Sequence, residues 1–408
     1  MAEWDTRPLS DFVDPNRSIC YGIVQPGSAV SDGVPIVRVN NFIEGGIDTT
    51  NALRIDSEIE AKYRRSRLQG GELLITLVGS MGLTAIAAEE LRGWNVARAV
   101  GVVPLRADAD KRWINFVVRS KPAQDFILMR ANTTVQATFN LKDLAELPIP
   151  CPPDGARIEM SSMLSSLDDK IELNRRMNET LEAMARAIFK DWFVDFGPTR
   201  AKMEGRAPYL APDIWSLFPD RLDDDYKPEG WKTGTLGEVV TNIVDRRMAS
   251  AETAAIPYVP IDMIEPKCLT LSNWRPGSEA QTSLVGFKKR DILFGAMRPY
   301  FHKVAIAPFE GTTRTTVFIL RPLREADLAF AALLVTFEST IEFAASHSSG
   351  TTIPYAVWSG SMERMATVVP PIPIRDAFSE IIEPLIEKMR LAAEESRTLA
   401  ATRDLLLP

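Results

Sequence analysis

The stretch Leu164–Phe196, LSSLDDKIELNRRMNETLEAMARAIFKDWFVDF, decides the fold class of this chain. It lies in a segment, from about Arg157 to Phe196, that contains no Gly or Pro. Asn174 and Asn178 fall in its apolar seam, where a buried Asn trades stability for a fixed register. The pattern predicts a helix of about forty residues, roughly 60 Å long. The seam is heptad-like and is formed by Leu164, Leu167, Ile171, Leu181, Ile188 and Trp192, the first five being the expected pairing residues.

A second amphipathic segment runs from about Arg375 to Leu406. Pro384 lies inside it, so we expect a kink or a late helix start there. Both stripes are too narrow and too long to be buried by their own blocks, and we expect the two helices to pack on each other, antiparallel. The alternative is two core helices of separate domains. The second stripe is formed by Phe378, Ile382, Leu385, Met389, Ala392, Leu399 and Leu406, of which Leu385, Met389 and Leu399 are the expected pairing residues.

Each long helix follows a mixed block, and the two blocks repeat one another. Five matches occur in the same order, which indicates duplicated architecture. Chance similarity among short apolar runs is the alternative. The matched pairs are Trp4 with Trp231, Pro35 with Pro257, Glu72 with Asp291, NTTV from Asn132 with GTTI from Gly350, and Pro150 with Pro370.

The blocks contain short strand-like runs followed by helical segments, which predicts an α+β class. We therefore expect two similar mixed α/β globular domains separated by two long antiparallel helices in a coiled coil, with a pseudo-two-fold internal repeat. The expected strands are 36–39, 73–77, 100–105, 258–261, 292–294, 304–307 and 317–320, and the expected helices lie near 114–129 and 328–345. The expected domains are 1–153 and 231–373, with long helices at 154–197 and 374–408 and a Pro-rich irregular connector at 198–230.

Composition places the chain among ordinary globular proteins. It has 408 residues, of which 45% are apolar and 25% charged. No run of 18 apolar residues occurs, and the first residues, MAEWDTRPLS, have neither a basic start nor an apolar stretch, so we expect a cytoplasmic protein without a membrane partner. The three cysteines are widely spaced and suggest no disulfide framework.

The net charge of −7 is unevenly shared along the chain. Most of the acidity lies on the long helices and the connector, which leaves the blocks near neutral with local basic runs. The runs are KYRRSR at Lys62–Arg67 and KKR at Lys288–Arg290, each just before a central strand. They could contact phosphates, although a solvated basic loop is the commoner explanation for one such run.

The turn after the central strand differs sharply between the blocks. The first block reads LVGSMGLTAI, and the second reads GAMRPYFHKVAI, with Arg298, Tyr300, His302 and Lys303. A shared scaffold with different loops is what a duplicated binding module needs in order to recognise two different targets. The cluster favours contact with a base edge or a phosphate, although packing at a strand end would also explain Tyr300 and His302.

Familiar catalytic motifs are missing from the sequence. It contains no GxxxxGK[ST], no GxGxxG after a strand and no HExxH, and it has only two histidines. Asp220, Asp225 and Lys227 resemble a nuclease pattern only remotely, because their spacing is too short for two strands to present a metal. We therefore expect no catalytic and no metal-binding residues.

The segment Leu164–Phe196 resembles the central shared region of the specificity subunits of type I restriction-modification systems. GPTRAKMEGRAPYLAPDIWSLFPDRLD after it and the closing ESRTLAATRDLLLP are similar to the same family. The resemblance implies a non-catalytic subunit with two target-recognition domains, each reading half of a bipartite double-stranded DNA site. It also implies docking of modification subunits, expected to be two, which bring the methyl donor S-adenosylmethionine, and of restriction subunits for cleavage. This chain itself would hold no cofactor.

Two other classes remain open: an enzyme with an atypical site, and a scaffold that joins proteins through its helices. Cleavage or methylation of DNA by the purified chain would favour the enzyme. Full activity after shortening of the basic loops would favour the scaffold. The candidate DNA-binding residues are Arg64, Arg65, Arg67, Lys288, Lys289, Arg298, Tyr300, His302 and Lys303.

Overall fold

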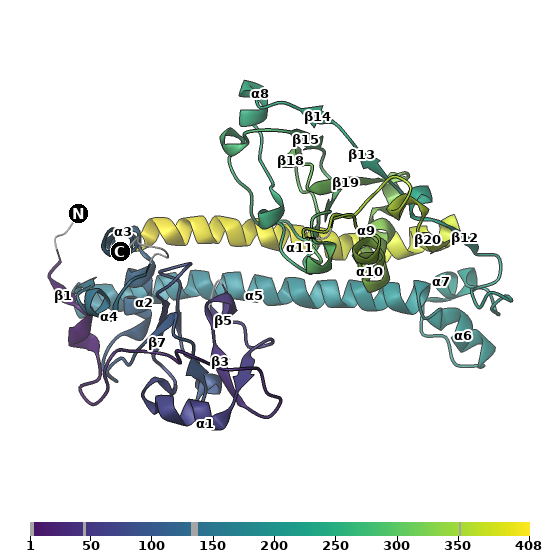
Figure 1. The fold of residues 1–408 in the computed structure, drawn as a ribbon. Coiled ribbons are helices and arrows are strands. Elements are labelled where there is room, and N and C mark those ends of the chain that lie inside the picture. Colours follow the sequence, from purple (N-terminus) through teal and green to yellow (C-terminus); the bar gives the residue numbers. More distant parts are fainter. Residues whose placement is uncertain (1–3, 44–45, 132–137, 351) are drawn as a thin grey trace. The chain divides into compact units, whose positions relative to one another are not determined.

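The computed structural model describes residues 4–43, 46–131, 138–350 and 352–408. It divides into two compact units, Met1–Glu172 with Thr398–Pro408 (unit 1) and Leu173–Arg397 (unit 2). Each unit mixes helices and sheet, as the predicted α+β class requires (Figure 1). The match at Asn132–Val135 lies outside the described residues.

Unit 1 is built on a four-stranded antiparallel sheet in the order β2-β10-β7-β8. Every residue of β7 and β10 is buried, because one face packs against helix α2 while the other covers a second cluster around Val37 and Leu74. The strands are β2 (Cys20–Tyr21), β7 (Leu73–Thr76), β8 (Thr84–Ile86) and β10 (Val100–Val103).

Smaller elements complete unit 1. Strand β1 pairs with β11, β3 joins β6 and β9, and β4 pairs with β5. The strands are β1 (Thr6–Pro8), β3 (Val34–Val37), β4 (Phe42–Ile43), β5 (Gly46–Ile47), β6 (Leu53–Ile55), β9 (Asn95–Val96) and β11 (Pro148–Pro150). The helices are α1 (Ser57–Glu60), α2 (Lys111–Arg119), α3 (Lys121–Arg130) and α4 (Leu141–Ala145).

Unit 2 repeats the central sheet and the β1–β11 pairing of unit 1, whereas its three-stranded sheet is entirely antiparallel and differs from that of unit 1, where β3 runs parallel to β9. Its central sheet has the order β13-β19-β16-β17, β12 pairs with β20, and β15 joins β14 and β18. The central strands are β13 (Val240–Ile243), β16 (Ile292–Gly295), β17 (Val304–Ile306) and β19 (Val317–Pro322). The others are β12 (Lys232–Thr235), β14 (Arg246–Arg247), β15 (Leu284–Phe287), β18 (Gly311–Arg314) and β20 (Ala366–Val369).

Three local expectations were wrong. Residues 258–261 form no strand: Tyr258 makes isolated bridges and Ile261 begins a 3-10 turn. Each predicted block helix is a pair of helices, because Ser120 and Phe337 are extended. The expected irregular connector contains two short helices. The helices are α9 (Leu328–Thr336) and α10 (Glu338–Ser346), with α8 (Ala251–Ala254) elsewhere in the second block and α6 (Gly197–Met203) and α7 (Pro212–Leu217) in the connector.

The two longest helices are α5 (Asp154–Phe193) and α11 (Ile372–Leu406). Helix α11 begins twelve residues before Pro384, so the expectation of a late start was wrong. A proline inside a helix removes one backbone hydrogen bond, and here the packing of Phe378 and Ile382 in the core of unit 2 offsets that loss.

Helices α5 and α11 contact each other within each unit, and in unit 2 they run antiparallel. In unit 2, the Asn174 amide donates to Glu395 (2.7 Å) and the Asn178 amide donates to the Met389 carbonyl (3.1 Å). In unit 1, Arg403 donates to Asp168 (2.8 Å). Within unit 2, Asn178 lies after Asn174 on α5, whereas its partner Met389 lies before Glu395 on α11, as expected for antiparallel helices.

The predicted seam is turned inward along both helices. Leu164, Leu181 and Met389 are buried. Ile188 and Leu385 are half-buried and pack against one core cluster. Leu167, Ile171 and Leu399 are also half-buried, whereas Leu406 is 48% exposed and departs from the predicted stripe.

No single helix in the described residues is both long and apolar enough to cross a membrane. Helices α9 and α10, together with the 3-10 turn before α9, pass the same test only as a pair bent by 59°.

Candidate nucleic-acid interface

A buried carboxylate holds the turn before the central strand in each unit. Glu72 is 1% exposed and accepts hydrogen bonds from the Gln69 backbone N–H and the Arg17 guanidinium, both at 2.7 Å. Asp291 is 2% exposed and accepts from the Lys288 backbone N–H at 2.7 Å and from Arg321 at 2.6 Å. Glu72 and Asp291 therefore fix the turn in the same way in their two units.

The backbone around these carboxylates also repeats. Gly71 donates to the Ala87 carbonyl (2.7 Å), and Arg290 donates to the Ala307 carbonyl (2.8 Å). Gly71 has φ +83° and Arg290 has φ +72°, so a residue with a side chain occupies a left-handed position in unit 2. The Arg290 guanidinium is engaged by Glu383 on α11 at 2.7 Å. Arg290 therefore ties the turn to the helix.

Lys288 and Lys289 stand on this turn with exposed side chains. Neither ammonium makes a hydrogen bond or ion pair within the described ranges. Because the turn backbone is fixed by Asp291, both lysines are presented from a rigid base. Such cations suit phosphate contacts that carry no sequence preference.

The predicted basic run of unit 1 forms a 3-10 segment, Ala61–Ser66, rather than a copy of the lysine turn. Arg64 and Arg65 are exposed, and Arg65 donates to the Ser18 hydroxyl at 3.3 Å. Arg67 forms a bidentate pair with the buried Glu60, whose pKa it lowers mainly through the hydrogen bond. The Arg67 guanidinium is therefore already paired within the protein, whereas the Arg64 and Arg65 side chains face solvent.

The loop between β16 and β17 carries the remaining candidates. Arg298 and His302 have φ +52° and +56°, and Gly79 and Gly82 have φ +78° and +85° at the equivalent ends of the unit 1 loop. Both loops therefore have left-handed residues at their two ends, but the unit 2 loop is one residue longer, contains a 3-10 turn at Pro299–Phe301 and has different side chains. Tyr300 is 53% exposed, and no ion pair engages Arg298 in the described structure.

His302 and Lys303 are placed differently from the surface role expected of them. His302 is 5% exposed, and its Nε2 lies 2.6 Å from the Thr336 carbonyl oxygen; burial lowers its pKa. The Lys303 ammonium donates to the Ile261 carbonyl at 2.9 Å, and desolvation lowers its pKa. Both side chains therefore bind backbone carbonyls on the buried side of the loop, and we do not propose them as DNA contacts.

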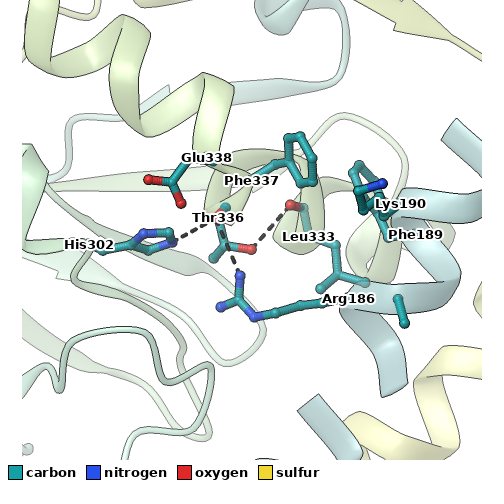
Figure 2. A pocket seen from close by; sticks show the side chains of 9 residues that line it. Arg186, Phe189, Lys190, His302, Leu333, Thr336, Phe337 and Glu338 are labelled. Atoms are coloured by element: carbon teal, nitrogen blue, oxygen red, sulfur yellow. Dashed lines mark hydrogen bonds between the residues drawn. The ribbon is translucent and has the colours of Figure 1, made fainter. Parts of the chain in front are cut away.

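A hollow of about 230 Å³ lies beside His302 (Figure 2). The Thr336 carbonyl accepts from both His302 and Arg186, the latter at 3.4 Å. Arg186 pairs with Glu182 at 2.6 Å, and Glu182 also accepts from the Leu269 backbone N–H at 2.9 Å. This network links α5 to the base of the loop.

Sequence reasoning missed two of these features. Glu182 is 6% exposed within α5, and its only sequence signal was an Arg four residues later. Phe301 was not among the candidate residues, although it is 47% exposed beside Tyr300. Only the backbone conformation of the loop reveals that Phe301 faces outward.

Metal ligands are not clustered in the described ranges, where no group of three or more His, Cys, Asp or Glu side chains could hold an ion. The connector carboxylates are engaged by lysines: Asp225 pairs with Lys227 at 2.8 Å, and Asp220 pairs with Lys202 at 3.0 Å. Burial raises the pKa of the Cys268 thiol to about 11, so this thiol is not reactive near neutral pH.

Residues 1–183 match the model of the type I restriction modification DNA specificity domain family. The chain is similar to the type I restriction enzyme EcoBI specificity subunit of Escherichia coli, with 29% identity over 46% of this chain and 37% of that relative. The matched region therefore spans little more than a third of that protein.

Similarity to a second relative is more extensive. The type I restriction enzyme MjaIX specificity subunit of Methanocaldococcus jannaschii is 25% identical over 83% of this chain and 76% of its own length. The fold resembles the crystal structure of the S subunit of a type I restriction-modification system from M. genitalium, with a TM-score of 0.53 and 15% identity, over 99% of this chain and 95% of that one.

Proposed function

We propose that this chain is a specificity subunit of the type I restriction-modification family, to which it is similar, and that it selects the DNA sequence on which such a complex acts. The proposed target is a bipartite, asymmetric double-stranded site, with each block contacting one half. The chain itself contributes recognition and no reaction.

One observation supports a site with two different halves. The two units share the strand order of the central sheet and the buried carboxylate, yet the loops differ, with Gly79-Ser80-Met81-Gly82 in one and the longer Arg298 to His302 in the other. Groups that form the scaffold are therefore preserved, and groups that can reach a base edge differ. Two recognition domains with such different loop side chains would prefer different bases.

The proposed layout is two recognition domains held apart by α5 and α11 as an antiparallel coiled coil, with a pseudo-two-fold relation between them. The contacts between α5 and α11 within each unit support it. With 40 residues, α5 extends roughly 60 Å. Half-sites about one helical turn apart, near 34 Å, fall within that length.

Partner subunits complete the proposed complex. Two modification subunits dock on the helices and bind the methyl donor S-adenosylmethionine, and restriction subunits join for cleavage. Because this chain carries a net charge of −7, we propose that the partners supply much of the phosphate contact and that the isolated chain binds DNA modestly.

Methylome sequencing of the host, with and without an intact gene for this chain, tests the proposal. We expect one two-part sequence to lose its methyl groups when the chain is absent. An unchanged methylome would overturn the proposal, and so would methylation or cleavage of DNA by the purified chain alone.

A further inference from the structure

Two large aromatic side chains stand exposed at the tip of the β16–β17 loop. Tyr300 is 53% exposed and Phe301 is 47% exposed. Their ring centroids lie 4.9 Å apart with the planes tilted by 58°. Adjacent exposed aromatics leave apolar surface in water that a partner can bury.

The loop holds these rings outward. The Phe301 backbone N–H donates to the Arg298 carbonyl at 3.0 Å, and the His302 N–H donates to the Pro299 carbonyl at 2.8 Å. The Arg298 N–H donates to the Pro354 carbonyl at 2.8 Å, and the His302 ring is fixed at the Thr336 carbonyl. Because both ends of the loop are anchored by hydrogen bonds, the two rings remain on its exposed side.

A cation accompanies the rings on the same loop. The Arg298 guanidinium is half-buried, and no carboxylate of the described residues pairs with it. An aromatic pair beside a free cation is the combination that enters a base stack while the cation contacts the neighbouring phosphate.

The equivalent loop of unit 1, which reads LVGSMGLTAI, contains no aromatic residue and no arginine. Its two inner residues are Ser80 and Met81, and Met81 packs partly against the core of its own unit. Any effect of the aromatic pair on DNA is therefore confined to one half of the site.

Resting on the proposed function, we propose that Tyr300 and Phe301 form a wedge that inserts at one base step and unstacks it. The step lies in the half-site contacted by the second block, and Arg298 binds the adjacent phosphate. The other half-site stays stacked. Flexible pyrimidine–purine steps are the expected position, because unstacking costs least there.

The test uses the full chain alone, without modification subunits, because a methyltransferase could unstack bases itself. Duplexes carry the sequence identified by the methylome, with 2-aminopurine at successive positions in both halves. At saturating protein we expect the fluorescence to rise at least twofold at one step, in one half only.

Three variants sharpen the test. Phe301→Ala and Tyr300→Ala should abolish the rise and weaken binding about tenfold. Phe301→Leu keeps an apolar wedge and should retain most of the rise. The control is Tyr226→Ala, which removes a 78% exposed aromatic ring from the connector and should change nothing.

Saturated binding without a rise at any step would overturn the wedge and leave sequence selection intact. A rise in both halves, or one that survives both alanine variants, would overturn it too. If the parent chain does not prefer the methylated sequence over an unrelated duplex, the proposed function itself fails.

Discussion

The Asn178 side chain on α5 donates its amide hydrogen to the Met389 carbonyl on α11, 3.1 Å away. Met389 is 1% exposed, so this polar contact lies within an apolar seam. The Asn178 carbonyl oxygen is buried without a partner in the described structure. Such a contact stabilises one register of two helices more than it stabilises the fold.

Asn178 should therefore respond in opposite directions to two substitutions. Asn178→Leu replaces the unpartnered oxygen with apolar surface and should raise the free energy of unfolding by about 1 kcal/mol. Asn178→Asp puts a carboxylate against the Met389 carbonyl and should lower it by roughly 1–3 kcal/mol. Urea denaturation measures both. Shifts of the same sign would contradict the seam assignment.

The buried carboxylates Glu72 and Asp291 should behave alike although they lie in different units. Glu72→Gln and Asp291→Asn each remove a charge that compensates a partly buried arginine, so each should cost roughly 1–3 kcal/mol locally. Hydrogen exchange of the amides in β7 and β16 reports the two sites separately. The matched control is Glu90→Gln, at an exposed position. Protection lost in only one unit would argue against equivalent turns.

Arg298 and Lys288 should divide DNA recognition between them. Arg298→Ala should weaken binding and relax base choice, because its guanidinium is proposed to position the aromatic wedge at one base step, and unstacking depends on the sequence of that step. Lys288→Ala should lower affinity equally for all sequences and reduce the salt slope by about one, as expected for a phosphate contact. Competition binding across a range of salt concentrations separates the two effects. Identical profiles for the two variants would remove this distinction.

His302 should make the chain less stable in mild acid. Burial lowers the pKa of His302 in the folded chain, and the cation Arg186 lowers it further. The unfolded chain therefore binds the proton first, and stability falls as the pH drops below the usual value of 6.5. His302→Gln removes this titration, so its stability should change less between pH 7 and 5.5. Equal slopes for the two proteins would show that His302 has the same pKa in the folded and the unfolded chain, which would contradict the effect of burial.

Periodicity predicted the long helices because their seams are long and uninterrupted. Leu164, Leu181 and Met389 are buried as their spacing required. The buried carboxylates could also be matched, since Glu72 and Asp291 precede similar apolar strands. Short elements were harder to predict from the sequence. The block helices divide at Ser120 and Phe337, where the backbone is extended although neither residue is a proline or a glycine.

Side-chain direction in the loops could not be predicted from the sequence. His302 reads as a surface imidazole, but its backbone is left-handed and its ring turns inward to the Thr336 carbonyl. Phe301, which the sequence did not single out, is 47% exposed because the same turn directs its ring outward. A reversal of chain direction within five residues decides which side chains face a ligand, and composition does not encode it.

Exchange of residues 231–373 for the equivalent block of another specificity subunit tests most directly whether each block reads its own half of the target. The methylated sequence of the exchanged chain is then read from the host genome. We predict that one half of the sequence changes and the other half is kept. A change in both halves, or in neither, would contradict recognition by two independent blocks.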